Sequence, residues 1–105
     1  NYRITLEGQQ IAVWDSSKGR FAFSKSVLPV LLENKTLPIV NLVEGHTWTG
    51  DLFTSNVAGF TGSPRVGDEI LVLQAGALRG SARAVAPSWE WPAAPGALAR
   101  ARHRL

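Results

Sequence analysis

The last predicted strand of this chain contains the sequence Arg100-Ala101-Arg102-His103-Arg104-Leu105, in which three arginines occupy alternate positions. Successive side chains of a β-strand point to opposite faces, so a regular strand places these arginines on one face and His103 on the other. A row of guanidinium groups suits phosphate, because arginine stays charged and presents a planar fork of donors. The segment therefore predicts a nucleic-acid-binding strand. The alternative is an exposed edge strand whose basic charge prevents aggregation.

Composition limits the classes of protein to which the chain can belong. Its 105 residues, 45% of them hydrophobic, suit one domain with one core. The net charge is +3, and no acidic residue follows Glu90, so positive charge collects near the C-terminal end, as in proteins that bind polyanions. The chain has no cysteine, which excludes disulfides, thiolate zinc sites and cysteine nucleophiles and fits a reducing cytosol.

No targeting or membrane segment is visible in the sequence. No apolar run is long enough to span a bilayer, and the chain does not open with a secretory signal. We therefore expect a cytoplasmic protein that makes no contact with membranes. The chain begins at Asn1 and contains no methionine, which indicates a piece of a longer polypeptide.

Short strands separated by glycine turns account for most of the pattern. Two strands at 3–6 and 9–14 form a hairpin, and a third at 20–23 completes a three-stranded unit. A helix capped by Ser26 is expected to run to about Asn34. The remaining strands are expected at 37–43, 51–57, 69–73, 79–85 and 97–104, with a single helical turn between Pro87 and Pro95. This pattern predicts a mainly β, α+β domain, a small mixed or closed barrel.

The order of these elements resembles the PUA domain, an RNA-binding β pseudobarrel. Four segments carry the resemblance: Asp51–Val57 (DLFTSNV), Val66–Val72 (VGDEILV), Gly80–Ala84 (GSARA) and Gly96–His103 (GALARARH). The chain is similar in particular to the C-terminal PUA region of the archaeal tRNA-guanine transglycosylase and archaeosine synthase group, in which a small β extension precedes the PUA domain. The resemblance implies a β-hairpin extension over residues 1–19, packed on the barrel, and a PUA-like RNA-binding domain over residues 20–105.

The sequence departs from the family pattern at three places. Asn56 stands where glycine is common, Ser81-Ala82 replaces a frequent valine-glycine pair, and Asn34-Lys35 occupies the turn after the first helix, where the family often has glycine. Asparagine tolerates the left-handed conformation, so this turn can still form. These differences indicate a divergent member of the family.

The resemblance also implies where RNA is bound, namely on the first helix, on the turn that follows it and on the terminal strand. The corresponding residues here are Lys25, Asn34, Lys35, Arg100, Arg102 and Arg104. For the two lysines, an ordinary solvated side chain is the alternative. In the loop between Gly45 and Gly50, His46 and Trp48 can either stack on an unpaired base or fold back over the barrel.

Other conspicuous residues have structural interpretations. His103 is expected to pack or cap, unless a bulge turns it outward. Trp89 and Trp91 are expected to close one end of the barrel, and one of them can stay exposed as a partner contact. Asp68 and Glu69 are adjacent, so they point to opposite faces of a strand and cannot act together on one substrate atom.

No catalytic signature is present, neither a nucleophile elbow nor a phosphate loop nor a dinucleotide fingerprint. We therefore predict a non-enzymatic domain, without catalytic residues, cofactor or metal, that binds RNA. Its expected partners are tRNA and a catalytic domain or subunit that modifies tRNA. The alternative is a β-barrel protein-interaction or structural module that docks a partner domain. A barrel that binds a small molecule is disfavoured, because so short a chain fills its interior with side chains.

Overall fold

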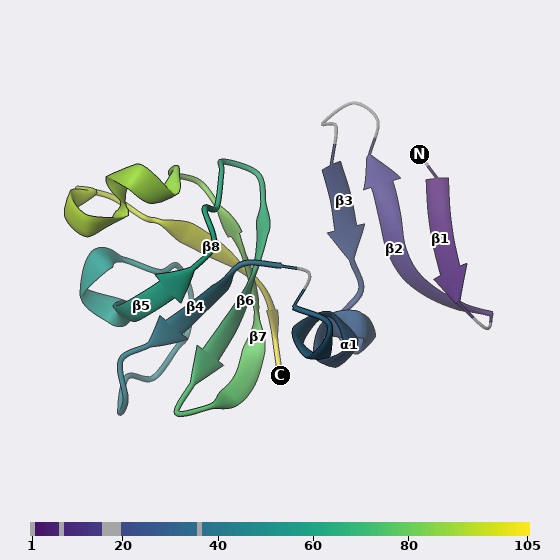
Figure 1. Ribbon diagram of the computed structural model, residues 1–105, viewed down its shortest axis with the longest axis horizontal. Coiled ribbons are helices and arrows are strands. Elements are labelled where there is room, and N and C mark those ends of the chain that lie inside the picture. Colours follow the sequence, from purple (N-terminus) through teal and green to yellow (C-terminus); the bar gives the residue numbers. More distant parts are fainter. Residues whose placement is uncertain (1, 7, 16–19, 36) are drawn as a thin grey trace.

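Two β-sheets of unequal size make up most of the structure (Figure 1), a computed structural model that describes residues 2–6, 8–15, 20–35 and 37–105. The smaller sheet has the antiparallel order β1-β2-β3, with β1 at Tyr2–Leu6, β2 at Gln9–Asp15 and β3 at Arg20–Phe23. Gly8 adopts φ 82° in the turn between the first two strands. The predicted three-stranded unit is confirmed. Strand β3, which begins directly after the expected domain boundary, pairs with β2 in this sheet.

A short helical segment links the two sheets. It consists of the 3₁₀ turn η1 (Lys25–Val27) and helix α1 (Leu28–Glu33), with Pro29 in the first turn of the helix as predicted. The predicted cap at Ser26 is wrong, because this residue lies inside η1 and neither helical element has a side-chain cap. After α1 the left-handed residue is Lys35, at φ 53°, whereas Asn34 keeps a right-handed conformation.

The larger sheet has the order β5-β4-β6-β7-β8. Its strands are β4 (Ile39–Leu42), β5 (Val57–Thr61), β6 (Glu69–Gln74), β7 (Ala77–Ala84) and β8 (Ala99–Arg104). The pair β4 and β6 is parallel, and the other pairs are antiparallel. The 3₁₀ segment η3 (Ser88–Ala93) precedes β8, in the stretch where a single helical turn was predicted.

The strand predicted at 51–57 is wrong. This stretch contains an isolated bridge at Leu52 and the 3₁₀ turn η2 (Thr54–Asn56), and β5 begins only at Val57. Asn56 accounts for the difference, because its Oδ1 accepts from the Phe53 amide and its own backbone amide donates to the Phe53 carbonyl. Asparagine forms such local hydrogen bonds readily, and they replace those of a sheet ladder. The bridge ties Leu52 to Ala99 at the outer edge of β8.

The hydrophobic core lies on one face of the larger sheet. It contains Val40, Leu42, Leu52, Ile70, Val72, Ala82, Ala84, Ala86, Trp91, Leu98 and Ala99. The Trp91 ring lies 4.7 Å from the Phe60 ring, centroid to centroid, and its Nε1 donates to the Ala86 carbonyl at 2.9 Å. Trp91 is buried whereas Trp89 is 78% exposed, so only Trp91 packs inside as predicted, and the prediction that Trp89 helps to close one end of the fold is wrong.

The opposite face of the larger sheet is also covered near its centre. Glu69, Leu71 and Ser81 alternate with core residues along β6 and β7, so they point away from the core, and yet they are buried. Helix α1 lies against this side, next to β7 and the C-terminal end of the chain (Figure 1). A charged residue therefore lies inside the protein, between the two sheets. Within the described residues, no helix has the length and apolar character needed to cross a membrane.

Candidate nucleic-acid interface

A β-bulge in β8 rearranges the predicted row of arginines. Ser81 pairs with His103 and Ala82 pairs with Ala101, which leaves Arg102 as an extra residue without a partner in the register. A bulge of this kind shifts the alternation of side chains by one residue. Arg102 and His103 consequently reach the same oxygen atom, whereas Arg104 contacts a different loop. The predicted common face for the three arginines is therefore wrong, and His103 does not lie opposite Arg102.

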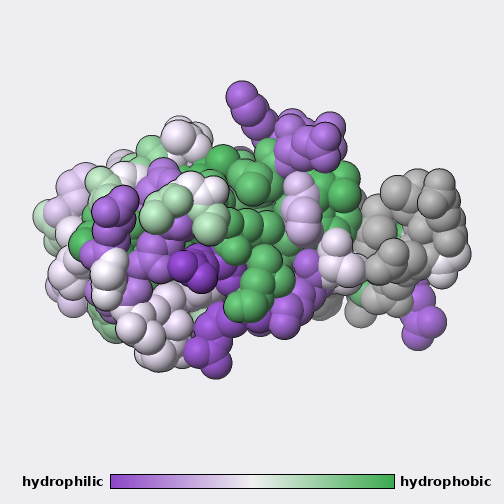
Figure 2. Space-filling view, turned by 90° about the horizontal axis from the view of Figure 1, so that it is seen from below, coloured by the Kyte–Doolittle hydropathy of each residue, from purple (hydrophilic) through white to green (hydrophobic). Residues whose placement is uncertain are grey.

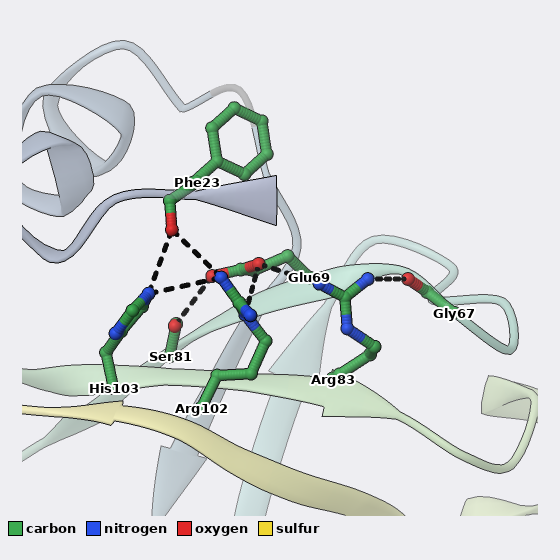
Figure 3. A network of polar contacts seen from close by, with 7 residues as sticks. All are labelled: Phe23, Gly67, Glu69, Ser81, Arg83, Arg102 and His103. Atoms are coloured by element: carbon green, nitrogen blue, oxygen red, sulfur yellow. Dashed lines mark hydrogen bonds and ion pairs between the residues drawn. The ribbon is translucent and has the colours of Figure 1, made fainter. Parts of the chain in front are cut away.

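Arg102 belongs to a buried polar network centred on Glu69 (Figure 3). The Glu69 side chain is only 1% exposed. Its Oε2 accepts from Ser81 Oγ at 2.7 Å, and its Oε1 lies 2.9 Å from Arg102 Nε and 3.5 Å from Arg83 Nη2. Arg83 also donates from Nη1 to the Gly67 carbonyl at 2.9 Å. Two arginines thus balance the charge of one buried carboxylate, and a hydroxyl donates a hydrogen bond to it, as a buried charge requires.

The same network ties β3 to β8. Arg102 Nη2 and His103 Nε2 approach the Phe23 carbonyl oxygen at 2.9 and 2.8 Å. A carbonyl only accepts, so the hydrogen of this imidazole is on Nε2, and the 3.2 Å contact between Nη2 and Nε2 joins two donors and is not a hydrogen bond. Arg102 Nε has no well-aligned hydrogen bond among the described residues, so its contact with Glu69 is an ion pair. Arg102 thus connects the two sheets, which removes the geometric basis of its predicted RNA contact.

Arg104 lines a surface hollow of about 300 Å³ at the end of β8. The hollow also contains the predicted stacking residues His46 and Trp48, so three of the candidate residues meet here. Its lining is His46, Thr47, Trp48, Gln74, Arg79, Arg104 and Leu105. Figure 2 views the molecule from this end and shows strongly hydrophilic side chains beside hydrophobic ones in the middle of the face.

Gln74 holds the loop that forms one wall of the hollow. This residue is only 9% exposed, and its Nε2 donates to the Val43 carbonyl at 2.9 Å and to the His46 carbonyl at 2.7 Å. Its Oε1 accepts no hydrogen bond from the described residues. The loop is therefore fixed by a buried amide that retains an acceptor of its own.

Trp48 and Arg104 are held by the same loop. Trp48 packs partly against the core, and its Nε1 donates to the Gly50 carbonyl at 2.6 Å. Arg104 donates from Nη1 to the Thr49 carbonyl at 3.0 Å. Both side chains are thus anchored by one hydrogen bond each, and most of the guanidinium donors of Arg104 remain available.

Arg79, the second arginine of the hollow, was not among the residues predicted from the sequence. It is the extra residue of a bulge in β7, between Leu78, which pairs with Leu73, and Gly80, which pairs with Val72. Gly80 has φ 148°, and a Cβ at this position would overlap the His103 carbonyl oxygen. A glycine inside a predicted strand is a signal for a bulge, and it could have drawn attention to Arg79.

The other candidate residues lie outside the hollow. Lys25 is exposed at the start of η1, and Asn34 and Lys35 are exposed at the end of α1, where Asn34 Nδ2 donates to the Val30 carbonyl at 2.8 Å. Arg100 is exposed and pairs in register with Arg83, on the face that carries Glu69. The predicted set is therefore split between the hollow, the helix ends and the covered face of the sheet. Nowhere in the described ranges do three or more histidine, aspartate or glutamate side chains group as metal ligands.

Comparisons with known proteins bear on the fold alone. No family model matches the chain, and no curated protein matches it. The chain is similar to the crystal structure of AF0587, a protein of unknown function, with a TM-score of 0.72 and 18% sequence identity. The match covers 95% of this chain but 36% of that protein, so the chain spans about a third of its length. An identity this low supports a shared fold and says nothing of activity.

Proposed function

We propose that the chain is a PUA-like RNA-binding domain with tRNA as its expected partner, acting as an accessory to an enzyme that modifies tRNA. Two features of the fold support the PUA-like interpretation. The chain follows the expected order of strand, helix, strand, further strands, helical turn and terminal strand. In addition, the hydrogen bonds between Leu52 and β8 join the segment before β5 to the opposite edge of the sheet, although the two sheets do not close into a barrel.

The observation that carries the proposal is a set of exposed cationic side chains without an acidic partner among the described residues. The ion pairs among described residues involve Arg65, Arg83 and Arg102. Other exposed cations form no ion pair with a described carboxylate, among them Lys25, Lys35, Arg79, Arg100 and Arg104. Unpaired cations on one small domain favour a polyanionic ligand, and phosphate contacts supply most of the affinity of such complexes.

RNA would be held by its backbone and its shape. Arginine and lysine contacts to phosphate set the position of the ligand but carry no sequence information. The major groove of an RNA duplex is too deep and narrow for side chains to read, so selectivity depends on helix ends, junctions and unpaired bases. The chemistry of modification would belong to another domain or subunit.

Filter binding of tRNA at several salt concentrations tests the proposal. The double variant Lys35→Gln/Arg100→Gln is expected to lower the slope of log affinity against log salt by about 0.7–0.9 for each phosphate that the variant no longer neutralises. Arg65→Gln is a control for the loss of a single charge, half of what the double variant removes, from an exposed side chain that already pairs with Asp68. Affinity that does not depend on salt, or an absence of tRNA binding, would contradict the proposal.

A specific observation favours the second candidate function, a protein-interaction module. Trp89 in η3 is 78% exposed and Phe53, which precedes η2, is 46% exposed. These two short helices contact each other, with Thr54 Oγ1 donating to the Trp91 carbonyl at 2.8 Å. Docking through such apolar side chains would persist at high salt. Trp89→Ser would then abolish capture of a partner domain and leave tRNA binding unchanged.

A further inference from the structure

We propose that the hollow between the 43–50 loop and the ends of β7 and β8 binds one unpaired nucleotide. Arg79 and Arg104 would hold its phosphate, and Trp48 and His46 would contact its base. This inference rests on the proposed function and makes it more specific, because it names one binding site and one feature of the RNA.

Two arginine pairs come from the same two strands. Arg83 of β7 and Arg102 of β8 meet at the Glu69 carboxylate. Arg79 of β7 and Arg104 of β8 meet at the hollow, and their strands are joined there because Gly80 pairs with Arg104. No described carboxylate lies within ion-pair distance of this second pair. The chain thus provides one arginine pair with an internal anion and leaves the other for an external one.

Phosphate is the anion that suits the second pair. Arginine forks bind phosphate oxygens through two parallel hydrogen bonds. Arg104 uses one donor on the Thr49 carbonyl, which positions the guanidinium group, and the Arg79 side chain makes no hydrogen bond with any described residue. Glu44 lies in the same loop but does not line the hollow, so it leaves the site open to an anion.

The remaining lining suits a base. Trp48 and His46 supply aromatic rings, on which unpaired bases stack. Gln74 lines the hollow and is only 9% exposed, with its Nε2 donating twice to the loop and its Oε1 left without a described donor. An amino or imino group of a base would satisfy this acceptor. Such a combination of anion donors, rings and an amide acceptor without a described donor distinguishes a nucleotide from a simple anion.

The size of the hollow favours an unpaired nucleotide over a duplex. Its volume of about 300 Å³ lies at the lower end of small-ligand pockets, which range over roughly 300–1,000 Å³. A single base with its phosphate fits this space, whereas a base pair within a duplex does not. We therefore expect recognition of a single-stranded end or a flipped-out nucleotide.

The experiment compares two hairpin RNAs of equal length, one blunt and one with a few unpaired nucleotides at its end. Fluorescence anisotropy gives their affinities for the chain and for the variants Arg79→Gln and Arg65→Gln. Arg65 precedes β6, whereas the hollow lies at the other end of that strand, so the second variant is a control of equal charge. Arg79→Gln is expected to weaken binding of the unpaired end by roughly tenfold, equivalent to one charge-assisted hydrogen bond, and to affect the blunt hairpin no more than Arg65→Gln does.

A second measurement tests base recognition without depending on RNA affinity. Adenosine monophosphate is titrated against the protein while the indole NH resonances are followed by NMR, with inorganic phosphate in a parallel titration. A shift of the Trp48 resonance that only the nucleotide produces is expected, and it should disappear with His46→Ala/Arg79→Gln. Equal shifts with both anions would overturn base recognition.

The two proposals fail in different ways. Equal affinity for the two hairpins, with Arg79→Gln behaving like Arg65→Gln, would overturn the nucleotide site and leave RNA binding intact. Binding of neither hairpin, with no nucleotide-specific shift, would overturn both proposals. Displacement of the nucleotide by an acidic peptide, in a chain that binds neither hairpin, would identify the hollow as a protein-binding site and overturn the inference.

Discussion

Strands β7 and β8 supply an arginine pair at each of two places, and the two pairs have opposite surroundings. Arg83 and Arg102 are mostly buried, at 13% and 26% exposure of their side chains, and share the Glu69 carboxylate. Arg79 and Arg104 are exposed at the mouth of a hollow and have no described carboxylate within reach. The same residue type on the same strands therefore serves the fold at one place and is free for a ligand at the other.

The surroundings of each arginine thus decide its role. A buried cation must be paired, because desolvation of an unpaired charge is expensive, and removing one partner leaves the other uncompensated. An exposed cation has no such need, and its loss changes stability little. If this contrast holds, substitutions at the two places should separate stability from RNA binding.

The greatest loss of stability is expected from Glu69→Gln. The substitution keeps the shape of the side chain but leaves Arg83 and Arg102 without a buried counter-charge, so it should lower the free energy of unfolding by about 3–5 kcal/mol. Urea denaturation followed by tryptophan fluorescence measures the change. Glu33→Gln is the control, because Glu33 is exposed at the end of α1, and it should cost less than about 0.5 kcal/mol.

Similar midpoints for the two glutamate variants would contradict the contrast between the arginine pairs. They would mean that the Glu69 network contributes no net stability and that the paired arginines are as dispensable as the exposed ones. The slope of the denaturation curve must stay unchanged for this conclusion, because a changed slope reports a different extent of unfolding.

A smaller but still large effect is expected from Gly80→Ala. Gly80 lies between Arg79 and Ser81, which belong to the two different sites, and its φ of 148° brings β7 and β8 close together. A side chain there is strained and overlaps the His103 carbonyl oxygen, so we expect a loss of about 2–3 kcal/mol. The measurement is again urea denaturation, combined with RNA binding, which should weaken because the bulges shift.

Gly59→Ala is the matched control for this glycine. Gly59 also lies in a strand, β5, but it has no positive φ. A Cβ atom at this position would have no neighbouring heavy atom within 4 Å. Alanine at this position should be neutral or slightly stabilising, by up to about 1 kcal/mol. If both substitutions lowered the free energy of unfolding equally, the close approach of β7 to β8 would not be the reason for glycine at position 80.

Much of the fold could be predicted from the sequence because its signals are local. Alternating side chains and turn glycines located the hairpin around Gly8 and the strands β6 and β7, and proline limited the segment 88–93 to a helical turn. The predicted strand at 51–57 failed for an equally local reason, since Asn56 closes a tight turn on Phe53. The residue pattern of this stretch favours a strand, but the hydrogen bond from the Phe53 amide to the Asn56 side chain stabilises a turn instead.

The site was harder to predict because it depends on two bulges. The bulge at Arg102 is a property of the register between β7 and β8. The alternating residue pattern of β8 alone does not predict it. One signal was nevertheless present, since Glu69 opens an apolar strand and a charged residue in such a place needs a partner. The identity of the partners, Arg83 of β7 and Arg102 of β8, could be found only from the structure.

The smallest effects are expected from two matched variants of β8, Arg102→Gln and Arg104→Gln, which compare the buried arginine pair with the exposed one in both stability and RNA affinity. Arg102→Gln removes one of two cations from Glu69 and a donor from the Phe23 carbonyl, so it should cost about 1.5–3 kcal/mol of stability. Arg104→Gln removes one exposed hydrogen bond to the Thr49 carbonyl and should cost less than about 0.5 kcal/mol. Affinity for RNA should follow the opposite order, with Arg104→Gln weakening binding more than Arg102→Gln. Both variants are measured under conditions in which they are folded. Because the substitutions remove the same charge from the same strand, charge alone would change RNA affinity equally, and that outcome would contradict a special role for the hollow.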